Sequence, residues 1–259
     1  MNFKTFCLNN HHVLYEEMPS RDPLFEKFYL IENPMRDPIV AIPDGCIDLQ
    51  FTWENNTCYG YAVGSFLTGK LTQTGTYQRC FGMKLRPGVI FNFMRHNVFD
   101  VIESRIPLSR YLDIRSLELS LEEKQELPEM VSEAQYYFDR QIITPIHNIA
   151  SHTAEMICSM PGGCRVSDMI QTLGYSHRYV DNVFKGYFGV SVKKYSDIIR
   201  IQTAIDYLET MDVMDVIAGL GYYDQAHFIH DFKKYTSLTP QSFVKQNRRS
   251  QLDQTLVIV

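Results

Sequence analysis

The stretch GYYDQAHFIHDFKKYTSLTP (221–240) decides how the C-terminal part of this chain folds, because GYSHRYVDNVFKGYFGVS (174–191) repeats its pattern. The offset between the copies is 47 residues before the turn and 48 after one inserted residue. Equivalent positions are Val166 and Val213, Leu173 and Leu220, Gly174 and Gly221, Phe184 and Phe232, and Tyr187 and Tyr235. A shared register of this length predicts two copies of one structural unit.

Each copy has the sequence features of a helix-turn-helix unit. A short run with helical apolar spacing ends in Leu-Gly-Tyr, and Gly174 and Gly221 supply the positive φ that a tight turn between helices requires. Ser176 and Asp224 follow the turns and suit the N-cap of a second helix. The C-terminal part is therefore predicted to contain two helix-turn-helix units.

The second helix of each copy combines an apolar stripe with a polar outer face. The expected inward residues are Val180, Val183 and Phe184 in the first copy, and Phe228, Phe232 and Tyr235 in the second. The outer faces, which we predict to contact DNA, hold His177, Arg178, Tyr179, Asp181, Asn182 and Lys185, and Gln225, Ala226, His227, His230, Lys233 and Lys234. Arginine and histidine can donate to guanine, and asparagine and glutamine can bind adenine through two hydrogen bonds.

Two other interpretations of the second copy are open. Asp224, His227 and His230 lie three residues apart, as metal ligands on one helix can, and the polar face can also be an ordinary solvated surface. An aspartate at an N-cap is already occupied by backbone amides, and two histidines without a further donor rarely hold a metal ion. We therefore favour DNA contact and expect neither a metal nor a cofactor.

The segment KKYSDIIRIQTAIDYL (193–208) between the copies has the pattern of an amphipathic helix. Ile198, Ile201, Ile205 and Leu208 form its apolar stripe. Sixteen helical residues span about 24 Å. Such a linker can hold two reading helices about one DNA turn, ~34 Å, apart.

These features resemble the DNA-binding domain of the AraC/XylS family of bacterial transcription regulators. The residues that carry the resemblance are GLGYYDQAHFIHDFKKYTSLTP (219–240) and GYSHRYVDNVFKGYFGVS (174–191). The resemblance implies seven helices with two recognition helices at about 177–186 and 225–235. This sequence differs from the family pattern at Ile170 and Ile217, where alanine is usual, and at Asn182, where the family often has an arginine that contacts DNA.

The front part of the chain has the period-two pattern of β-strands between residues 39 and 85. In IDLQFTW (47–53) apolar and polar residues alternate, which predicts a half-buried strand, and turns are expected at Pro43–Gly45 and Arg86–Gly88. IPDGCIDLQF (42–51), AVGSFLTG (62–69) and GMKLRPGVIFNFM (82–94) loosely resemble a β-rich sensor domain of the same family.

The fold class expected from these patterns is α+β, with an N-terminal β-rich, barrel-like domain that includes helices and a C-terminal all-α domain. The expected bounds are 1–140 for the sensor or dimerisation domain and 141–163 for a helical connector that ends in a Pro-Gly-Gly break. A double helix-turn-helix domain at 164–249 and a tail at 250–259 follow. The net charge of −5 comes from the front part, and the C-terminal part is slightly basic, which permits DNA binding without requiring it.

A DNA-binding regulator, controlled by a small-molecule effector or by dimerisation, is the function that the sequence favours. Expected partners are double-stranded promoter DNA, RNA polymerase, an effector and a second copy of the chain. No stretch is long and apolar enough to span a bilayer, and the N-terminus does not have a signal-peptide pattern, so the cytoplasm is the expected location and no membrane partner is expected.

Two alternatives to this function are open. A thiol-based redox regulator would use Cys46, Cys58 or Cys80. An enzyme with a cupin-like catalytic barrel would need several metal ligands on neighbouring strands, yet residues 39–90 contain no histidine, so we expect the chain not to be an enzyme. Arg79, Lys84 and Arg86 can either bind an anionic effector or lie at solvated strand edges.

Overall fold

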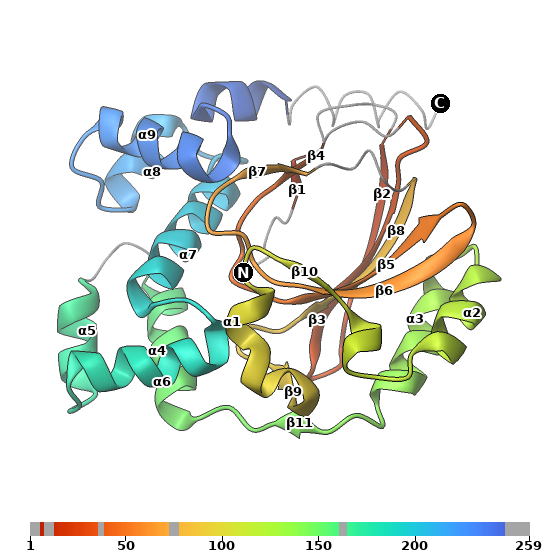
Figure 1. Ribbon diagram of the computed structural model, residues 1–259. Helices are drawn as coiled ribbons and strands as arrows, with labels where there is room; N and C mark the ends of the chain where they lie inside the picture. Colours follow the sequence, from red (N-terminus) through yellow and green to blue (C-terminus); the bar gives the residue numbers. More distant parts are fainter. Residues whose placement is uncertain (1–5, 8–12, 36–38, 73–77, 161–164, 247–259) are drawn as a thin grey trace.

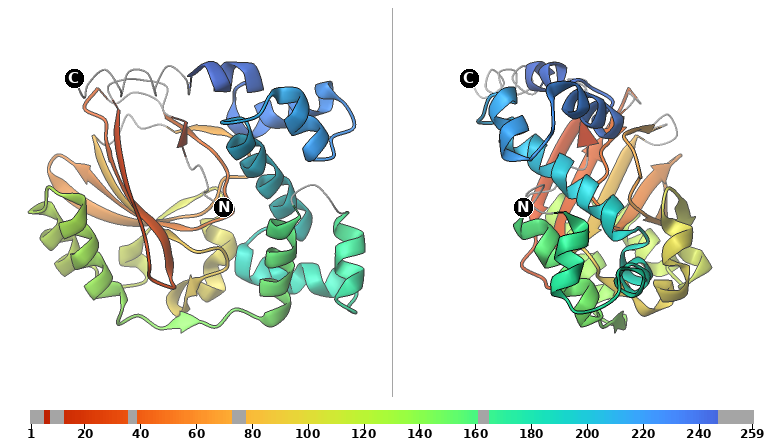
Figure 2. Two further views of the ribbon diagram at one scale, coloured as in Figure 1. Left: turned by 180° about the vertical axis from the view of Figure 1, so that it is seen from behind. Right: turned by 90° about the vertical axis from the view of Figure 1, so that its left-hand side faces the viewer.

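A computed structural model describes residues 6–7, 13–35, 39–72, 78–160 and 165–246 of the chain. An N-terminal region built around β-sheets is followed by a C-terminal region of helices, which confirms the predicted α+β class (Figure 1). Figure 2 shows that these helices lie along one side of the sheet region. Along the described part of the chain, no helix is long and apolar enough to cross a membrane.

The larger sheet has six antiparallel strands in the order β10-β6-β5-β8-β3-β2. Their bounds are Leu14–Pro19 for β2, Phe25–Glu32 for β3, Asp48–Glu54 for β5, Thr57–Val63 for β6, Arg79–Leu85 for β8 and Arg105–Pro107 for β10. A three-stranded sheet joins β1 (Phe6–Cys7), β4 (Ile39–Ala41) and β7 (Lys70–Thr72), and β9 (Ile90–Phe91) pairs with β11 (Ile143–Thr144). The turns predicted at 43–45 and 86–88 are present, with φ of 75° at Gly45 and 80° at Gly88.

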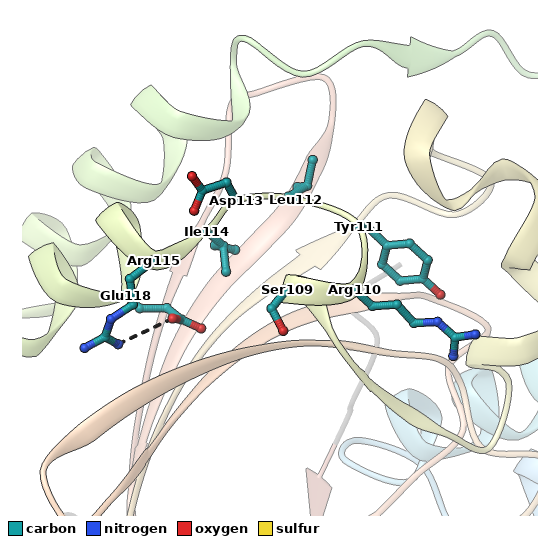
Figure 3. A pocket seen from close by; sticks show the side chains of 8 residues that line it. All are labelled: Ser109, Arg110, Tyr111, Leu112, Asp113, Ile114, Arg115 and Glu118. Carbon is teal, nitrogen blue, oxygen red and sulfur yellow. Dashed lines mark ion pairs between the residues drawn. The ribbon is translucent and has the colours of Figure 1, made fainter.

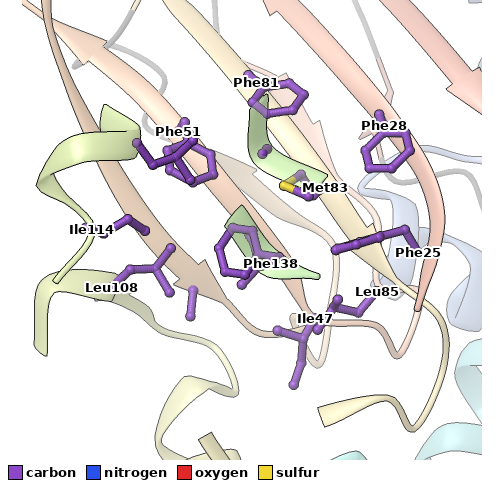
Figure 4. Close-up of a cluster of buried hydrophobic side chains, with 14 of the residues drawn as sticks. Phe25, Phe28, Ile47, Phe51, Phe81, Met83, Leu85, Leu108, Ile114 and Phe138 are labelled. Carbon is purple, nitrogen blue, oxygen red and sulfur yellow. The ribbon is translucent and has the colours of Figure 1, made fainter. Parts of the chain in front are cut away.

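One face of the six-stranded sheet carries the main apolar core of the N-terminal region (Figure 4). Phe51 and Phe81 stack across β5 and β8 with ring centroids 5.9 Å apart. The helices α2 (Arg115–Glu122) and α3 (Leu127–Phe138) cover this face and contribute buried residues such as Leu121 and Phe138. The short helix α1 (Val98–Val101) lies between the sheet and the C-terminal helices.

The opposite face of this sheet is polar and nevertheless buried, so the prediction of a half-buried strand at 47–53 is wrong. Asp48, Gln50 and Thr52 alternate with the core residues, yet each is less than a tenth exposed. Asp48 accepts a hydrogen bond of 2.7 Å from the hydroxyl of Tyr29, and Gln50 donates to the same oxygen at 2.9 Å. In this strand, the alternation of apolar and polar residues therefore separates an apolar buried face from a polar buried face.

The lysine at the centre of this polar face is fully buried. Lys84 forms ion pairs with Asp44 and, at 3.3 Å, with Asp48. Burial alone would lower the pKa of Lys84, but the two carboxylates outweigh it and hold this pKa well above its ordinary value. Arg79 pairs with Glu32 at 3.4 Å, and Arg86 donates to the carbonyl oxygen of Asp22 at 3.2 Å. Lys84 is thus not at a solvated edge, and all three cations have partners within the protein.

The C-terminal region contains α4 (Asn148–Ser159), α5 (Val166–Thr172), α6 (His177–Phe188), α7 (Val192–Tyr207), α8 (Val213–Gly219) and α9 (Gln225–Thr236), and residues 240–246 are also helical. The predicted linker is α7, and its apolar stripe is buried at Ile198, Ile201, Ile205 and Leu208. One side of α7 joins a core with α5 and α6, and another joins a core with α8 and α9.

Helix α4 packs with the first helix-turn-helix unit. Ile149, Ala150, Ala154 and Ile157 share one core with residues of α5, α6 and α7. The predicted connector at 141–163 therefore includes a helix that belongs to the C-terminal core, and we place the domain boundary before α4. The Pro-Gly-Gly break at 161–163 and the tail at 250–259 lie outside the described residues.

Candidate nucleic-acid interface

The first helix-turn-helix unit is formed by α5 and α6. Gly174 has a φ of 72° in the turn, and the side chain of Ser176 accepts a hydrogen bond of 3.3 Å from the backbone amide of Tyr179. Ser176 therefore caps α6, as predicted. Phe184 and Phe188 stack with centroids 4.1 Å apart and hold the inner face of α6 in the core.

The second unit is formed by α8 and α9. Gly221 has a φ of 65°, and the carboxylate of Asp224 accepts a hydrogen bond of 2.7 Å from the backbone amide of His227. Asp224 thus caps α9. Phe228 and Phe232 are fully buried against Tyr222 and Phe243, which confirms the predicted inward stripe.

Most of the residues predicted for the outer face of α6 are exposed. His177, Arg178, Tyr179 and Asn182 point away from the core. Asp181 does not: its carboxylate accepts a hydrogen bond of 2.9 Å from the backbone amide of Val192 and pairs with Lys185 at 2.6 Å. Asp181 thereby fastens α6 to the start of α7, and Lys185 is half-buried beside it.

The outer face of α9 presents all six predicted residues to solvent. These are Gln225, Ala226, His227, His230, Lys233 and Lys234. His227 lies with its Nε2 atom 3.4 Å from a carboxylate oxygen of Asp231 and with its ring edge-on to Tyr222. The ring of His227 is therefore held in place while half of the side chain remains exposed.

Exposed tyrosines flank both recognition helices and were missed by the sequence predictions. Tyr223 is 94% exposed, immediately before the N-cap of α9. Tyr175 is 52% exposed in the equivalent turn and packs on Tyr179, with ring centroids 5.4 Å apart. The sequence contained a signal for Tyr223, because the offset between the copies grows by one residue at this turn.

The geometry does not favour the metal interpretation of Asp224, His227 and His230. Asp224 is occupied by the backbone of α9. Within the described ranges, no three His, Cys, Asp or Glu side chains are grouped so that they could hold a metal ion.

The cysteines proposed for redox chemistry are buried. Burial raises the pKa of Cys80 to about 12 and also raises the pKa values of Cys46 and Cys58. The thiolate is the reactive form of cysteine, and it is disfavoured at all three positions. The structure therefore gives no support to the redox alternative.

A pocket of about 480 Å³ lies in the N-terminal region, at the approach to α2 (Figure 3). Its lining residues are Ser109, Arg110, Tyr111, Leu112, Asp113, Ile114, Arg115 and Glu118. Arg115 pairs with Glu118 at 3.5 Å, and Glu118 also accepts a hydrogen bond of 3.0 Å from the backbone amide of Gly60. Glu118 thereby fastens α2 to β6, whereas its ion pair with Arg115 lies within α2.

The family model that matches this chain covers part of the C-terminal region. Residues 169–246 match the sequence model of a family described as "Helix-turn-helix domain". The chain is 29% identical over 85 residues to the uncharacterized HTH-type transcriptional regulator YtdP of Bacillus subtilis. It is 28% identical over 82 residues to the transcriptional regulatory protein HptR of Staphylococcus aureus. These matches cover 32% and 31% of the chain, and 11% and 32% of the two relatives.

Solved structures with similarity to the chain include ToxT from Vibrio cholerae O395 and the C-terminal domain of AraT, a response regulator from Geobacillus stearothermophilus. ToxT has a TM-score of 0.43 at 13% identity, over 93% of this chain and 98% of that one. The AraT domain has a TM-score of 0.37 at 19% identity, over 39% of this chain and 88% of that one. By sequence, residues 169–246 are similar to helix-turn-helix domains, in agreement with the geometry of the two units.

Proposed function

We propose that this chain is a sequence-specific DNA-binding transcription regulator that reads DNA through α6 and α9. The observation that supports the proposal is the repetition of one capped, exposed helix in two units joined by α7. His177 and Gln225, Tyr179 and His227, and Asn182 and His230 occupy equivalent exposed positions at the repeat offset of 48. Equivalent polar positions on two helices suit two successive major grooves.

The exposed residues divide into two chemical roles. Arg178, Asn182, Gln225, His227 and His230 carry donors and acceptors that suit base edges. Lys233 and Lys234 lie in the last turn of α9 and suit phosphates, which position a protein without reporting the base sequence. Asp181 has an intramolecular role in this proposal and makes no DNA contact.

Control by the N-terminal region, through an effector or through dimerisation, is part of the proposal. The two regions share cores, since Val40 and Ile42 pack with the second unit, and Cys46 packs with the first. A displacement of these three residues would therefore act directly on the cores of the helical units. A regulator of this kind acts in the cytoplasm, where it meets promoter DNA and RNA polymerase, and carries out no enzymatic reaction of its own.

The proposal is tested by selecting binding sites for the full chain from a random duplex library and measuring affinity by fluorescence anisotropy. We expect an enriched motif with two half-sites about one helical turn apart and affinity that falls steeply with salt. The double variant Asn182→Ala/His230→Ala should lose the enriched motif. Binding that is independent of sequence, or absent, would contradict the proposal.

A further inference from the structure

The C-terminal ends of both recognition helices contact the N-terminal region. Gly189 is the C-cap of α6, and an added Cβ there would lie 2.6 Å from Cγ1 of Ile102 and 3.2 Å from Cγ1 of Val98. Ser237 is the C-cap of α9, and the carbonyl oxygen of Lys234 in the last turn of this helix accepts a hydrogen bond of 3.0 Å from the backbone amide of Gly69. At the end of α6 the backbone lies against side chains of the N-terminal region, and at the end of α9 two backbone segments are in direct contact.

The two segments that make these contacts are bound to each other. We name residues 64–70 and 98–104 together the brace. The backbone amide of Gly64 donates to the carbonyl oxygen of Val101 at 3.0 Å, and the amide of Glu103 donates to the carbonyl oxygen of Ser65 at 3.2 Å. The amide of Leu67 donates to the carboxylate of Glu103 at 3.2 Å. The contact with α6 and the contact with α9 therefore belong to one linked structure.

The brace is rooted in the six-stranded sheet. Its first segment continues from the end of β6 and its second leads into β10, and these strands pair with Arg105 opposite Val63. The amide of Gly45, in the turn before β5, donates to the hydroxyl of Ser65 at 3.0 Å. Glu103 has a φ of 56°, a conformation that is unfavourable for a residue other than glycine and persists only where the surroundings fix it.

Apolar packing strengthens the contact with the first unit. Leu67 and Ile102 pack against the core formed by α4, α5, α6 and α7. On the other side, an added Cβ at Gly69 would lie 2.5 Å from the carbonyl oxygen of Tyr235 in α9. Figure 1 shows α1 beside the end of α6 and the chain before β7 reaching toward α9.

We propose that Gly69 and Ile102 are positioning residues for DNA recognition, because the brace fixes the separation and orientation of α6 and α9. Besides the brace, the two units are joined through α7 and through Val40, Ile42 and Cys46, which pack in their cores. Together, α6, α7, α9 and the brace form a closed frame. The N-terminal region thereby sets the half-site spacing that the two helices can read. The spacing rests on the proposed function, whereas the fixed separation of the helices does not.

The variant Gly69→Ala separates the brace from α9. Its Cβ would collide with the backbone of α9, which cannot move aside as a flexible side chain can. The variant Ile102→Ala weakens the other contact by removing apolar packing at the end of α6. Gly219→Ala is the matched control, because an added Cβ at this glycine in α8 meets no atom within 4 Å.

The direct test measures the distance between α6 and α9 in the full chain without DNA. Spin labels carried by unnatural amino acids replace the exposed, equivalent residues Asn182 and His230. We expect one narrow distance distribution in the parent chain and in Gly219→Ala, and a broader or shifted one in Gly69→Ala and Ile102→Ala. Circular dichroism establishes that each variant is folded. An unchanged distribution in folded Gly69→Ala and Ile102→Ala would overturn the proposal.

A second measurement uses duplexes selected from a random library, with the half-site spacing altered by one or two base pairs. The quantity measured is the ratio of affinities for the selected and the altered spacing. We expect this ratio to be large for the parent and for Gly219→Ala and to fall toward one for Gly69→Ala. A ratio that stays at the parental value would count against the brace. If the chain binds no DNA, the proposed function fails, and the distance measurement still decides whether the brace fixes the separation of α6 and α9.

Discussion

The two helix-turn-helix units share one sequence pattern but are stabilised by different surroundings. The first unit has α4 as an additional helix in its core and a stacked pair of rings at Phe184 and Phe188. The second unit instead packs Phe243, beyond α9, and Val40 and Ile42 from around β4. Neither repeated unit therefore forms its hydrophobic core alone. Each core includes residues from outside the unit, and these residues come from different parts of the chain.

The outer faces differ as well. In α6, Lys185 is paired with Asp181, whereas the equivalent Lys233 of α9 is exposed. Arg178 in the first copy corresponds to Ala226 in the second, and the second copy has an extra, fully exposed Tyr223. We infer that the first unit contributes more to base contacts near the start of its helix, and the second contributes more to phosphate contacts.

The largest expected effect concerns α4. A fragment of residues 165–246 lacks the four buried side chains that α4 adds to the first unit, whereas residues 145–246 retain them. Burial of an isoleucine side chain contributes about 1.5–3 kcal/mol and burial of an alanine methyl group about 0.8 kcal/mol, so we expect the shorter fragment to lose cooperative unfolding of its first unit. Circular dichroism during thermal unfolding makes the comparison. Identical melting curves for the two fragments would show that α4 is dispensable.

The next effect compares the cores of the units at equivalent positions. Phe184 and Phe232 are both fully buried. In the full chain, Phe184→Ala and Phe232→Ala should each lower the free energy of unfolding by about 3–5 kcal/mol, because truncation leaves a cavity. Urea denaturation measures the loss, and Tyr223→Ala, which removes a side chain that is 94% exposed, serves as the control. A stable Phe232→Ala variant would mean that the inner face of α9 is assigned incorrectly.

The parts of this architecture that the sequence predicted are those set by local rules. Ser176 and Asp224 cap their helices, the two turn glycines have positive φ, and the stripe of α7 is buried, because each depends on neighbours within a few residues. Spacing and residue type were sufficient for these features.

The features that the sequence did not predict depend on partners far along the chain. Lys84 looked like a surface residue in a strand, but its partner Asp44 is 40 residues away. The role of Asp181 depends on the backbone of Val192 at the start of the next helix. The packing of α4 in the core of the first unit was not predicted, because the Pro-Gly-Gly sequence after this helix suggests a domain boundary. Such a sequence does not report how the helices on either side of it pack.

An intermediate effect tests the assignment of base contacts. Gln225→Ala and His227→Ala should each weaken binding to the selected site by about 1–3 kcal/mol and change binding to unrelated duplexes little. In metal-free protein the same loss is expected, since Asp224 is occupied as an N-cap. Fluorescence anisotropy with both duplexes provides the data. Loss of bound zinc with unchanged discrimination would instead support a metal site.

A matched pair of lysines tests the assignment of phosphate contacts. Lys233→Ala should weaken binding to all sequences about equally and lower the slope of log affinity against log salt by about one. Lys185→Ala should change the slope less, because Lys185 is held by Asp181 at 2.6 Å. Salt titrations of the two variants measure both slopes. Equal slopes for the two variants would remove the difference that we infer between the units.

The smallest expected effect concerns the residue inserted in the second copy. Tyr223 lies in the turn between α8 and α9, where a helix-turn-helix unit passes close to the DNA backbone, and its hydroxyl can donate to a phosphate oxygen. Tyr223→Phe should therefore cost about 0.5–1.5 kcal/mol of binding free energy, equally for selected and unrelated duplexes, without changing the melting temperature. The salt slope should stay the same, because the phenol carries no charge. Tyr175→Phe is the matched variant in the first unit, where the ring packs on Tyr179, and a smaller loss is expected there. A loss confined to the selected duplex would place Tyr223 against a base rather than a phosphate, and no loss at all would leave the inserted residue without a part in DNA binding.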